Sequence, residues 1–146
     1  MKIPISVLVV IHTAKGEVLL LERADHPGFW QSVTGSIDFI GESLIETAAR
    51  ELLEETGIDA KIFDENALVS MNHSIEYEIY PEWRHRYPKD ITINTEHWFR
   101  MTLEDRVPVQ LAPREHISYK WESIEHAASM CFSPSNQEAI RKLNSI

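Results

Sequence analysis

The clearest structural signal in the chain lies in residues 35–58, which read GSIDFIGESLIETAARELLEETGI. Ser43 opens a Ser-Leu-Ile-Glu capping box, which is typical of a helix N-terminus. Apolar residues then recur at i, i+3, i+4 and i+7, a spacing that predicts one buried stripe: Ile45, Ala48, Ala49 and Leu52. Gly57 stands where a left-handed C-terminal cap is expected. These residues together predict a helix from Ser43 to Thr56.

The second half of this helix carries three carboxylates close together. Residues three or four apart are neighbours on a helix surface, so Glu51 lies next to both Glu54 and Glu55. Like charges this close repel each other unless a cation lies between them, and oxygen clusters suit hard ions such as Mg²⁺ or Mn²⁺. Arg50 can neutralise and orient the carboxylates without occupying the metal position. In isolation, such a Glu-x-x-Glu-Glu cluster is more often a solvated helix face. The residues on either side of it therefore decide between that interpretation and a metal site.

Most of the remaining chain reads as strands. Ile3–His12 is continuously apolar and β-branched, as in a strand that is covered on both faces. Further strands are predicted at Glu17–Arg23, Trp30–Val33, Leu68–Met71, Ile75–Tyr80, Thr92–Leu103 and Ser118–Trp121. A closing helix is predicted at Asn136–Leu143, with Ser135 as a candidate N-cap. Strands mixed with two helices, one of them mid-chain, predict an α/β sandwich in a single domain over residues 1–146.

Composition restricts the class of protein. The 23 acidic and 14 basic residues give a net charge of -9, which argues against generic nucleic-acid binding. The same charge would repel a free triphosphate, so a metal cofactor is attractive. Cys131 is the one cysteine, which excludes an intrachain disulfide and favours a reducing compartment. No stretch approaches the ~20 apolar residues of a membrane span, so we expect a cytoplasmic protein without membrane attachment.

The residues around the acidic cluster resemble the Nudix box. The signature is Gly, five residues, Glu, seven residues, then Arg-Glu-aliphatic-x-Glu-Glu-x-Gly-aliphatic. The matching residues here are Gly35, Glu42, Arg50, Glu51, Leu52, Glu54, Glu55, Gly57 and Ile58. Six residues rather than five separate Gly35 from Glu42, an insertion that a loop can absorb. The resemblance implies an α/β/α sandwich with a mixed central sheet, and a Mg²⁺-dependent pyrophosphohydrolase in which Mn²⁺ can substitute.

Motifs outside the box resemble one branch of the Nudix hydrolases, the dihydroneopterin triphosphate pyrophosphatases of bacterial folate synthesis. These motifs are Phe29–Ser36, Arg84–Tyr87, Asn94–Glu96, Glu115–His116 and Tyr119–Trp121. The branch implies metal-assisted attack of water on phosphorus, with dihydroneopterin monophosphate and pyrophosphate as products. Two alternatives stay open. One is a Nudix hydrolase of nucleoside triphosphates, oxidised ones included, or of dinucleoside polyphosphates. The other is a Nudix module that binds a nucleotide without cutting it.

The resemblance also implies roles for individual residues. Glu51, Glu54 and Glu55 are the expected metal ligands, and Arg50 orients them. Glu115 is expected as a further ligand or as the general base, and the adjacent His116 is an alternative base.

Substrate contacts follow from chemistry and from the branch. Guanidinium groups fit phosphate oxygens, so cationic residues are expected at the triphosphate together with one hydroxyl: Lys2, Arg23, Thr34, Arg84 and Arg86. A pterin ring needs an aromatic or apolar face and polar edges, for which the candidates are Tyr77, Glu78, Ile79, Tyr80, Ser133 and Ser135. Core packing is the competing explanation for the aromatic residues.

Overall fold

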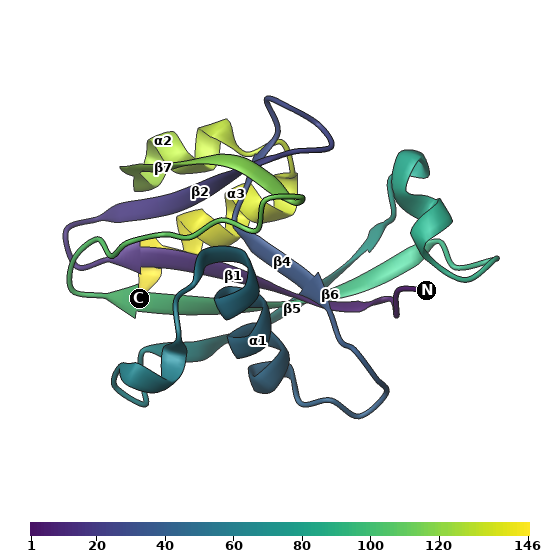
Figure 1. The fold of residues 1–146 in the computed structure, drawn as a ribbon, viewed down its shortest axis with the longest axis horizontal. Helices are drawn as coiled ribbons and strands as arrows, with labels where there is room; N and C mark the ends of the chain where they lie inside the picture. The colour runs from purple at the N-terminus through teal and green to yellow at the C-terminus, as the bar shows by residue number, and fades with distance from the viewer.

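A mixed seven-stranded sheet forms the centre of the protein in a computed structural model that describes all residues 1–146 (Figure 1). Its strands are β1 (Ile5–Thr13), β2 (Glu17–Arg23), β3 (Trp30–Gln31), β4 (Val33–Ser36), β5 (Leu68–Glu78), β6 (Ile93–Leu103) and β7 (His116–Ser123). The main order is β3-β2-β1-β6-β5, and β4 pairs with β1 while β7 pairs with β2. The β1–β6 pair is parallel, and the other pairs are antiparallel.

Helices cover both faces of this sheet. They are α1 (Leu44–Thr56), α2 (Ile124–Met130) and α3 (Pro134–Arg141), with 3₁₀ turns η1 (Ala60–Ile62), η2 (Pro81–Arg86) and η3 (Lys142–Ser145). The apolar core is accordingly divided into a cluster under α1 and a cluster under α2 and α3. The predicted α/β/α sandwich with a mixed central sheet is therefore confirmed. None of the helices is long and apolar enough to cross a bilayer.

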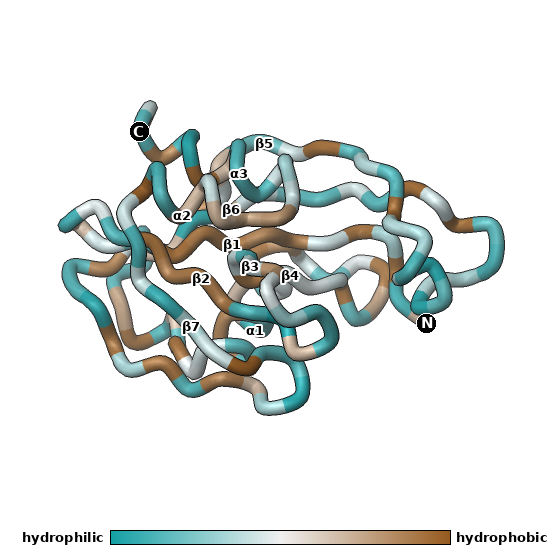
Figure 2. The backbone as a smooth tube through the Cα atoms, turned by 90° about the horizontal axis from the view of Figure 1, so that it is seen from above, coloured by the Kyte–Doolittle hydropathy of each residue, from teal (hydrophilic) through white to brown (hydrophobic).

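Strand β1 contributes to both parts of the core. Val7, Val9 and Ile11 face the α1 side, whereas Leu8 and Val10 face the α2–α3 side. This confirms the prediction from its continuous apolar run, since every side chain of a doubly covered strand is buried. Figure 2 shows hydrophobic colour along the central parts of β1 and β2, in the middle of the molecule.

Helix α1 has the predicted ends but a different buried face. Ser43 Oγ accepts a hydrogen bond from the Glu46 N–H at 3.2 Å, and Gly57 caps the C-terminus with φ 77°. The predicted stripe is wrong at Ile45, which is 45% exposed. The residues that the helix buries are Thr47, Ala48, Leu52, Glu55 and Thr56. The helix is thus rotated so that an acidic residue, rather than Ile45, faces the sheet.

Several strand and helix boundaries differ from the predictions. β5 is one strand rather than two, with a register shift between Ser70 and Ser74. At this irregularity Asn72 adopts a positive φ of 54°. The predicted Trp30–Val33 strand is divided into β3 and β4. The last helix begins at Pro134, and its N-cap is Ser133, which accepts from the Asn136 N–H at 3.4 Å. Helix α2 was not predicted from the sequence.

The β5–β6 hairpin projects beyond the body of the sheet and carries η2 next to the N-terminus (Figure 1). The Lys2 N–H donates a hydrogen bond to the Arg86 carbonyl at 2.7 Å, which ties the first residues to η2. This contact places the Lys2 and Arg86 side chains in the same region, at the mouth of the cavities described next.

Candidate active site

Gly35 on β4 makes room for the Glu51 carboxylate of α1. A Cβ atom at Gly35 would overlap Glu51 Cδ, so a side chain here would displace the carboxylate. Gly35 is therefore needed for space, because its backbone does not have a positive φ. The helix brings Glu55 to the same side one turn later, where its side chain is 2% exposed. Strand β4 and helix α1 thus hold two carboxylates against the sheet.

Arg50 links carboxylates from helix α1 and from the loop that precedes it. Its guanidinium lies 2.8 Å from Glu51 Oε1 and 3.0 Å from Glu42 Oε1, and it donates to the Ser36 carbonyl at 3.1 Å. Asp38 lies 3.2 Å from the same guanidinium. Hydrogen bonds to Glu42 lower its pKa to about 2, and the bond from Arg50 is the largest cause. Arg50 thus contacts both Glu51 and Glu42, and its orienting role stays a prediction.

The extra residue between Gly35 and Glu42 is absorbed on the surface. Residues 38–41 are exposed, with Phe39 at 58% and Ile40 at 78% exposure. Glu42 still reaches α1, where it accepts a hydrogen bond from the Thr47 hydroxyl at 2.9 Å besides its pair with Arg50. The insertion therefore leaves both ends of the loop in contact with the helix.

Replacing Arg50 by lysine should destabilise the protein and lower its activity. A lysine keeps the charge but cannot donate to several carboxylates in one plane, so Glu42 and Glu51 lose hydrogen bonds. We expect a decrease of about 1–3 kcal/mol in the free energy of unfolding, measured by urea denaturation. The control is Arg141→Lys, because Arg141 forms an exposed pair with Glu125 and should tolerate the change. Equal stability of Arg50→Lys and wild type would contradict a linking role for the guanidinium.

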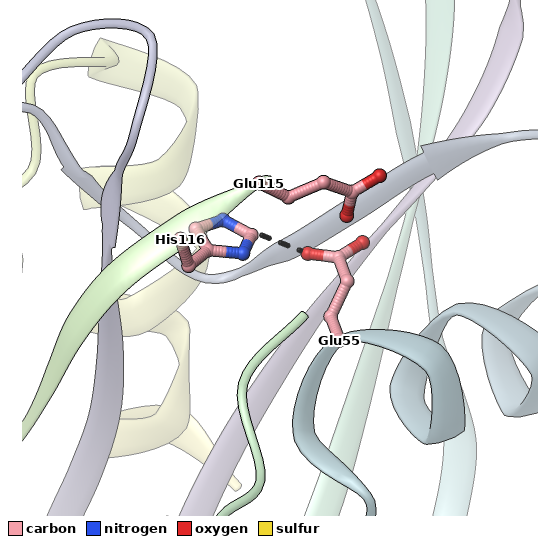
Figure 3. A group of neighbouring side chains, drawn as sticks. All are labelled: Glu55, Glu115 and His116. Atoms are coloured by element: carbon pink, nitrogen blue, oxygen red, sulfur yellow. Dashed lines mark ion pairs between the residues drawn. The ribbon is translucent and has the colours of Figure 1, made fainter. Parts of the chain in front are cut away.

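Glu55, Glu115 and His116 form a potential metal site (Figure 3). Each offers one ligand atom, and these atoms all lie within 4.8 Å of one another. Figure 3 shows the Glu115 carboxylate, just ahead of β7, directed toward the Glu55 carboxylate at the end of α1. Glu55 Oε1 is buried and has no hydrogen-bond partner. Burial raises the pKa of Glu55 well above its ordinary value, and the adjacent Glu51 raises it further.

His116 is a buried neutral imidazole. Burial, followed by the nearby charge of Arg23, lowers its pKa to about 4. Its Nε2 lies 3.3 Å from the Gln31 amide nitrogen and 3.8 Å from Glu55 Oε1. The contact with Gln31 fixes the ring, whereas Glu115 is exposed and free to reach solvent.

The acidic residues line one side of a cavity of about 700 Å³, called here the acidic cavity. Glu51, Glu55, Glu115 and His116 contribute to it. Glu54 does not line this cavity, since its side chain is 56% exposed and lies 3.7 Å from Arg50 on the outer side of α1. Its role as a metal ligand stays a prediction.

A second cavity of about 490 Å³, called here the aromatic cavity, lies beside the first. Aromatic rings form one of its walls: Tyr80 and Trp83 are 5.4 Å apart in an edge-to-face arrangement, and Phe132 lies 5.9 Å from Trp83. All six residues expected to bind the pterin ring line it: Tyr77, Glu78, Ile79, Tyr80, Ser133 and Ser135. Its size and lining are typical of a pocket for a small molecule.

Cationic residues stand where the two cavities meet. Lys2, Arg23, Thr34 and Arg86 line both cavities, whereas Arg84 lines neither. Arg84 instead bonds to the Ile79 carbonyl and to Glu78, so its position gives no support to a substrate contact. Burial, and then the charges of Arg86 and Arg23, lower the pKa of Lys2. A cluster of positive charges this close suits a polyanion.

Other residues of the site were missed by sequence reasoning. Asp25 pairs with Arg23 at 2.8 Å and with Arg86 at 3.0 Å, and thus holds both arginines. Gln31 accepts a hydrogen bond from Arg23 at 3.0 Å and contacts His116. The Arg23-x-Asp25 spacing was a usable signal for the pair between Asp25 and Arg23. Nothing in the sequence indicated the contacts of Gln31 with Arg23 and His116.

Known proteins share the sequence pattern and the fold of this chain. The NUDIX domain model matches residues 2–143. The dihydroneopterin triphosphate diphosphatase of Haemophilus influenzae (strain ATCC 51907 / DSM 11121 / KW20 / Rd) is 45% identical over 139 residues, which cover 94% of this chain and 85% of that protein. The enzyme of the same name from Escherichia coli (strain K12) is 41% identical, with 97% and 92% covered. The solved structure of the E. coli dihydroneopterin triphosphate pyrophosphohydrolase superposes with a TM-score of 0.89 at 40% identity, covering 97% of this chain and 94% of that one.

Proposed function

The chain belongs to the NUDIX family, and from this membership we propose that it hydrolyses dihydroneopterin triphosphate to dihydroneopterin monophosphate and pyrophosphate. The observation that supports this substrate is the order of the cavities. An acidic cavity, a cationic junction and an aromatic cavity follow one another without a break. A compound with a triphosphate at one end and a flat heterocyclic ring at the other has the matching order of groups.

Nudix hydrolases generally act with divalent metal ions, and the residues of this chain fit such an ion. The unpartnered Glu55 Oε1 and the surrounding carboxylate oxygens are the donor set that Mg²⁺ prefers. We propose Glu51, Glu55 and Glu115 as ligands, with Glu54 as a further ligand and Mn²⁺ as a substitute for Mg²⁺. When bound, the ion offsets the negative charge of the phosphates and lowers the pKa of a water molecule.

The protein side chains contribute binding, orientation and proton transfer. Lys2, Arg23 and Arg86 bind phosphate oxygens, and the Thr34 hydroxyl donates a further hydrogen bond. The aromatic cavity holds the ring, so that the bond between the α- and β-phosphates lies next to the carboxylates. Glu115 accepts the proton of the attacking water, because it is the exposed carboxylate beside Glu55.

A product assay across several triphosphates tests this proposal. In the presence of Mg²⁺ we expect pyrophosphate release from dihydroneopterin triphosphate to be at least ~10-fold faster, as kcat/KM, than from GTP, dGTP or 8-oxo-dGTP. Such a ratio corresponds to ~1.4 kcal/mol of transition-state binding. Removal of the metal with EDTA should abolish the activity, and excess Mg²⁺ should restore it.

Different outcomes separate the competing functions. Faster hydrolysis of an oxidised nucleotide or of a dinucleoside polyphosphate would assign the chain to another Nudix activity. Binding of these compounds without any Mg²⁺-dependent hydrolysis would indicate a non-catalytic module. The retained carboxylates Glu51, Glu54 and Glu55 support catalysis over that second outcome.

A further inference from the structure

Glu96 is a buried carboxylate on the floor of the aromatic cavity. It lies on β6 between Asn94 and Trp98, on the face that packs under α2 and α3. Only 4% of the residue is exposed. The other carboxylates that line this cavity are exposed, namely Glu76, Glu78 and Glu138. Glu96 thus differs from the rest of the lining in being a charge that the fold withdraws from water.

Neutral donors hold one oxygen of this carboxylate. Trp98 Nε1–H donates to Glu96 Oε1 at 3.0 Å, and the Ser135 hydroxyl donates to the same oxygen at 3.2 Å. No lysine, arginine or histidine pairs with Glu96, and no hydrogen bond reaches Oε2. Burial accordingly raises the pKa of Glu96 above its ordinary value.

A buried carboxylate without a cation destabilises a fold, and replacement by a neutral residue is often stabilising. The hydrogen bonds from Trp98 and Ser135 require only an acceptor oxygen at position 96, which a glutamine side chain would also supply. The negative charge and the free Oε2 are therefore unexplained by packing alone. Groups of this kind cluster at functional sites, where a ligand supplies the missing donors.

The neighbouring strands add polar groups to the same floor. The β1–β6 register pairs Ser6 with Glu96, and the β5–β6 register pairs Tyr77 with Asn94. The Asn94 side-chain amide lies 2.7 Å from Ser6 Oγ and 3.1 Å from the Tyr77 hydroxyl, and so fixes both hydroxyl groups at the cavity. A ligand edge that lies on Glu96 therefore meets further hydrogen-bonding groups on either side.

We propose that Glu96 determines ring specificity by accepting hydrogen bonds from the ring N–H and the exocyclic amino group of a 2-amino-4-oxopyrimidine edge. This inference rests on the proposed function, in which the aromatic cavity holds the ring. Pterins and guanine share this edge. Its two adjacent donors match the two acceptor sites of the free Oε2, since Oε1 already accepts from Trp98 and Ser135. Adenine presents a ring nitrogen lone pair beside its amino group, which a carboxylate repels. Glu96 thus selects against adenine compounds in two ways: the ring nitrogen lone pair repels the carboxylate, and the hydrogen bond from a ring N–H is lost.

Binding of fluorescent pteridines without metal tests the role of Glu96 directly. The probes are neopterin and its 2-oxo analogue, in which an oxygen replaces the amino group. We expect wild type to bind neopterin about 10- to 100-fold more tightly than the analogue, as for hydrogen bonds to a charged group. Glu96→Gln should lose this preference through weaker neopterin binding. Glu104→Gln removes an exposed carboxylate just after β6 and should retain the preference.

Equal affinity of wild type for the two probes, or an unchanged preference in Glu96→Gln, would overturn the proposal. If the glutamine variant does not fold, Glu96→Asp replaces it. It keeps the charge and withdraws the carboxylate by one methylene group, so the preference should fall by at least ~10-fold.

Nucleotide turnover separates this inference from the proposed substrate. GTP and inosine triphosphate differ only in the 2-amino group, so Glu96→Gln should reduce the discrimination between them. Loss of this discrimination in a protein that does not hydrolyse dihydroneopterin triphosphate would refute the substrate but retain the role of Glu96. Hydrolysis of dihydroneopterin triphosphate with no change in Glu96→Gln would refute the role of Glu96 alone.

Discussion

Replacement of Glu55 by glutamine is expected to lower turnover by at least ~10²-fold, the scale for loss of a group that stabilises transition-state charge. Glu55 is buried against β4, and its Oε1 has no protein donor. Glutamine has nearly the same shape but lacks the negative charge that a divalent ion needs. The measurement is single-turnover kinetics at saturating Mg²⁺. Hydrolysis by Glu55→Gln at the wild-type rate would refute the assignment of Glu55 as a ligand.

The same variant should be more stable than wild type when no metal is present. Folding then no longer buries a carboxylate that has one oxygen without a donor, so we expect a rise of about 2–4 °C in the midpoint of thermal unfolding. Mg²⁺ should raise the midpoint of wild type, since a ligand that binds only the folded state stabilises it. Glu55→Gln should lose this response. Glu46→Gln removes an exposed carboxylate from the first turn of α1 and should retain it.

A methyl group at Gly35 is expected to displace the Glu51 carboxylate. The new Cβ of Gly35→Ala would overlap Glu51 Cδ, and the only relief is movement of the glutamate or of α1. We expect a loss of ~10²-fold in turnover and of about 1–3 kcal/mol in the free energy of unfolding, as for other overpacked sites. Activity assays and urea denaturation measure the two effects.

A second substitution distinguishes crowding from backbone strain. Aspartate at position 51 is one methylene shorter and withdraws the carboxylate from β4. The double variant Gly35→Ala/Glu51→Asp should therefore recover most of the lost stability while remaining inactive. Failure to recover would mean that the alanine acts on the backbone of β4 rather than on Glu51.

The sequence predicted the ends of α1 and the nature of its acidic face, because caps and carboxylates are local signals. It did not predict the rotation of the helix. Apolar spacing alone favoured Ile45 as buried, whereas the structure buries Glu55 and leaves Ile45 45% exposed. The competing requirement is the close packing of Glu51 on Gly35 of β4. The apolar spacing within the helix carries no information about this contact with a strand.

Contacts between distant segments were the least predictable part of the site. The strand at Thr92–Leu103 was predicted, and alternation along it places Glu96 on the same face as Trp98. A buried tryptophan on that face was therefore a usable signal that Glu96 is buried as well. The contact of Gln31 with His116 joins residues 85 positions apart, and no local pattern encodes it.

The parallel pairing of β1 with β6 affects how the chain acquires its structure. The register joins Ile5 to Thr95, a separation of 95 − 5 = 90 residues. During synthesis, the most hydrophobic strand thus leaves the ribosome long before the partner that completes its hydrogen bonds. Pairing over such a separation slows folding and keeps an apolar edge open to other chains. Nascent chains that end before β6 should consequently require a chaperone.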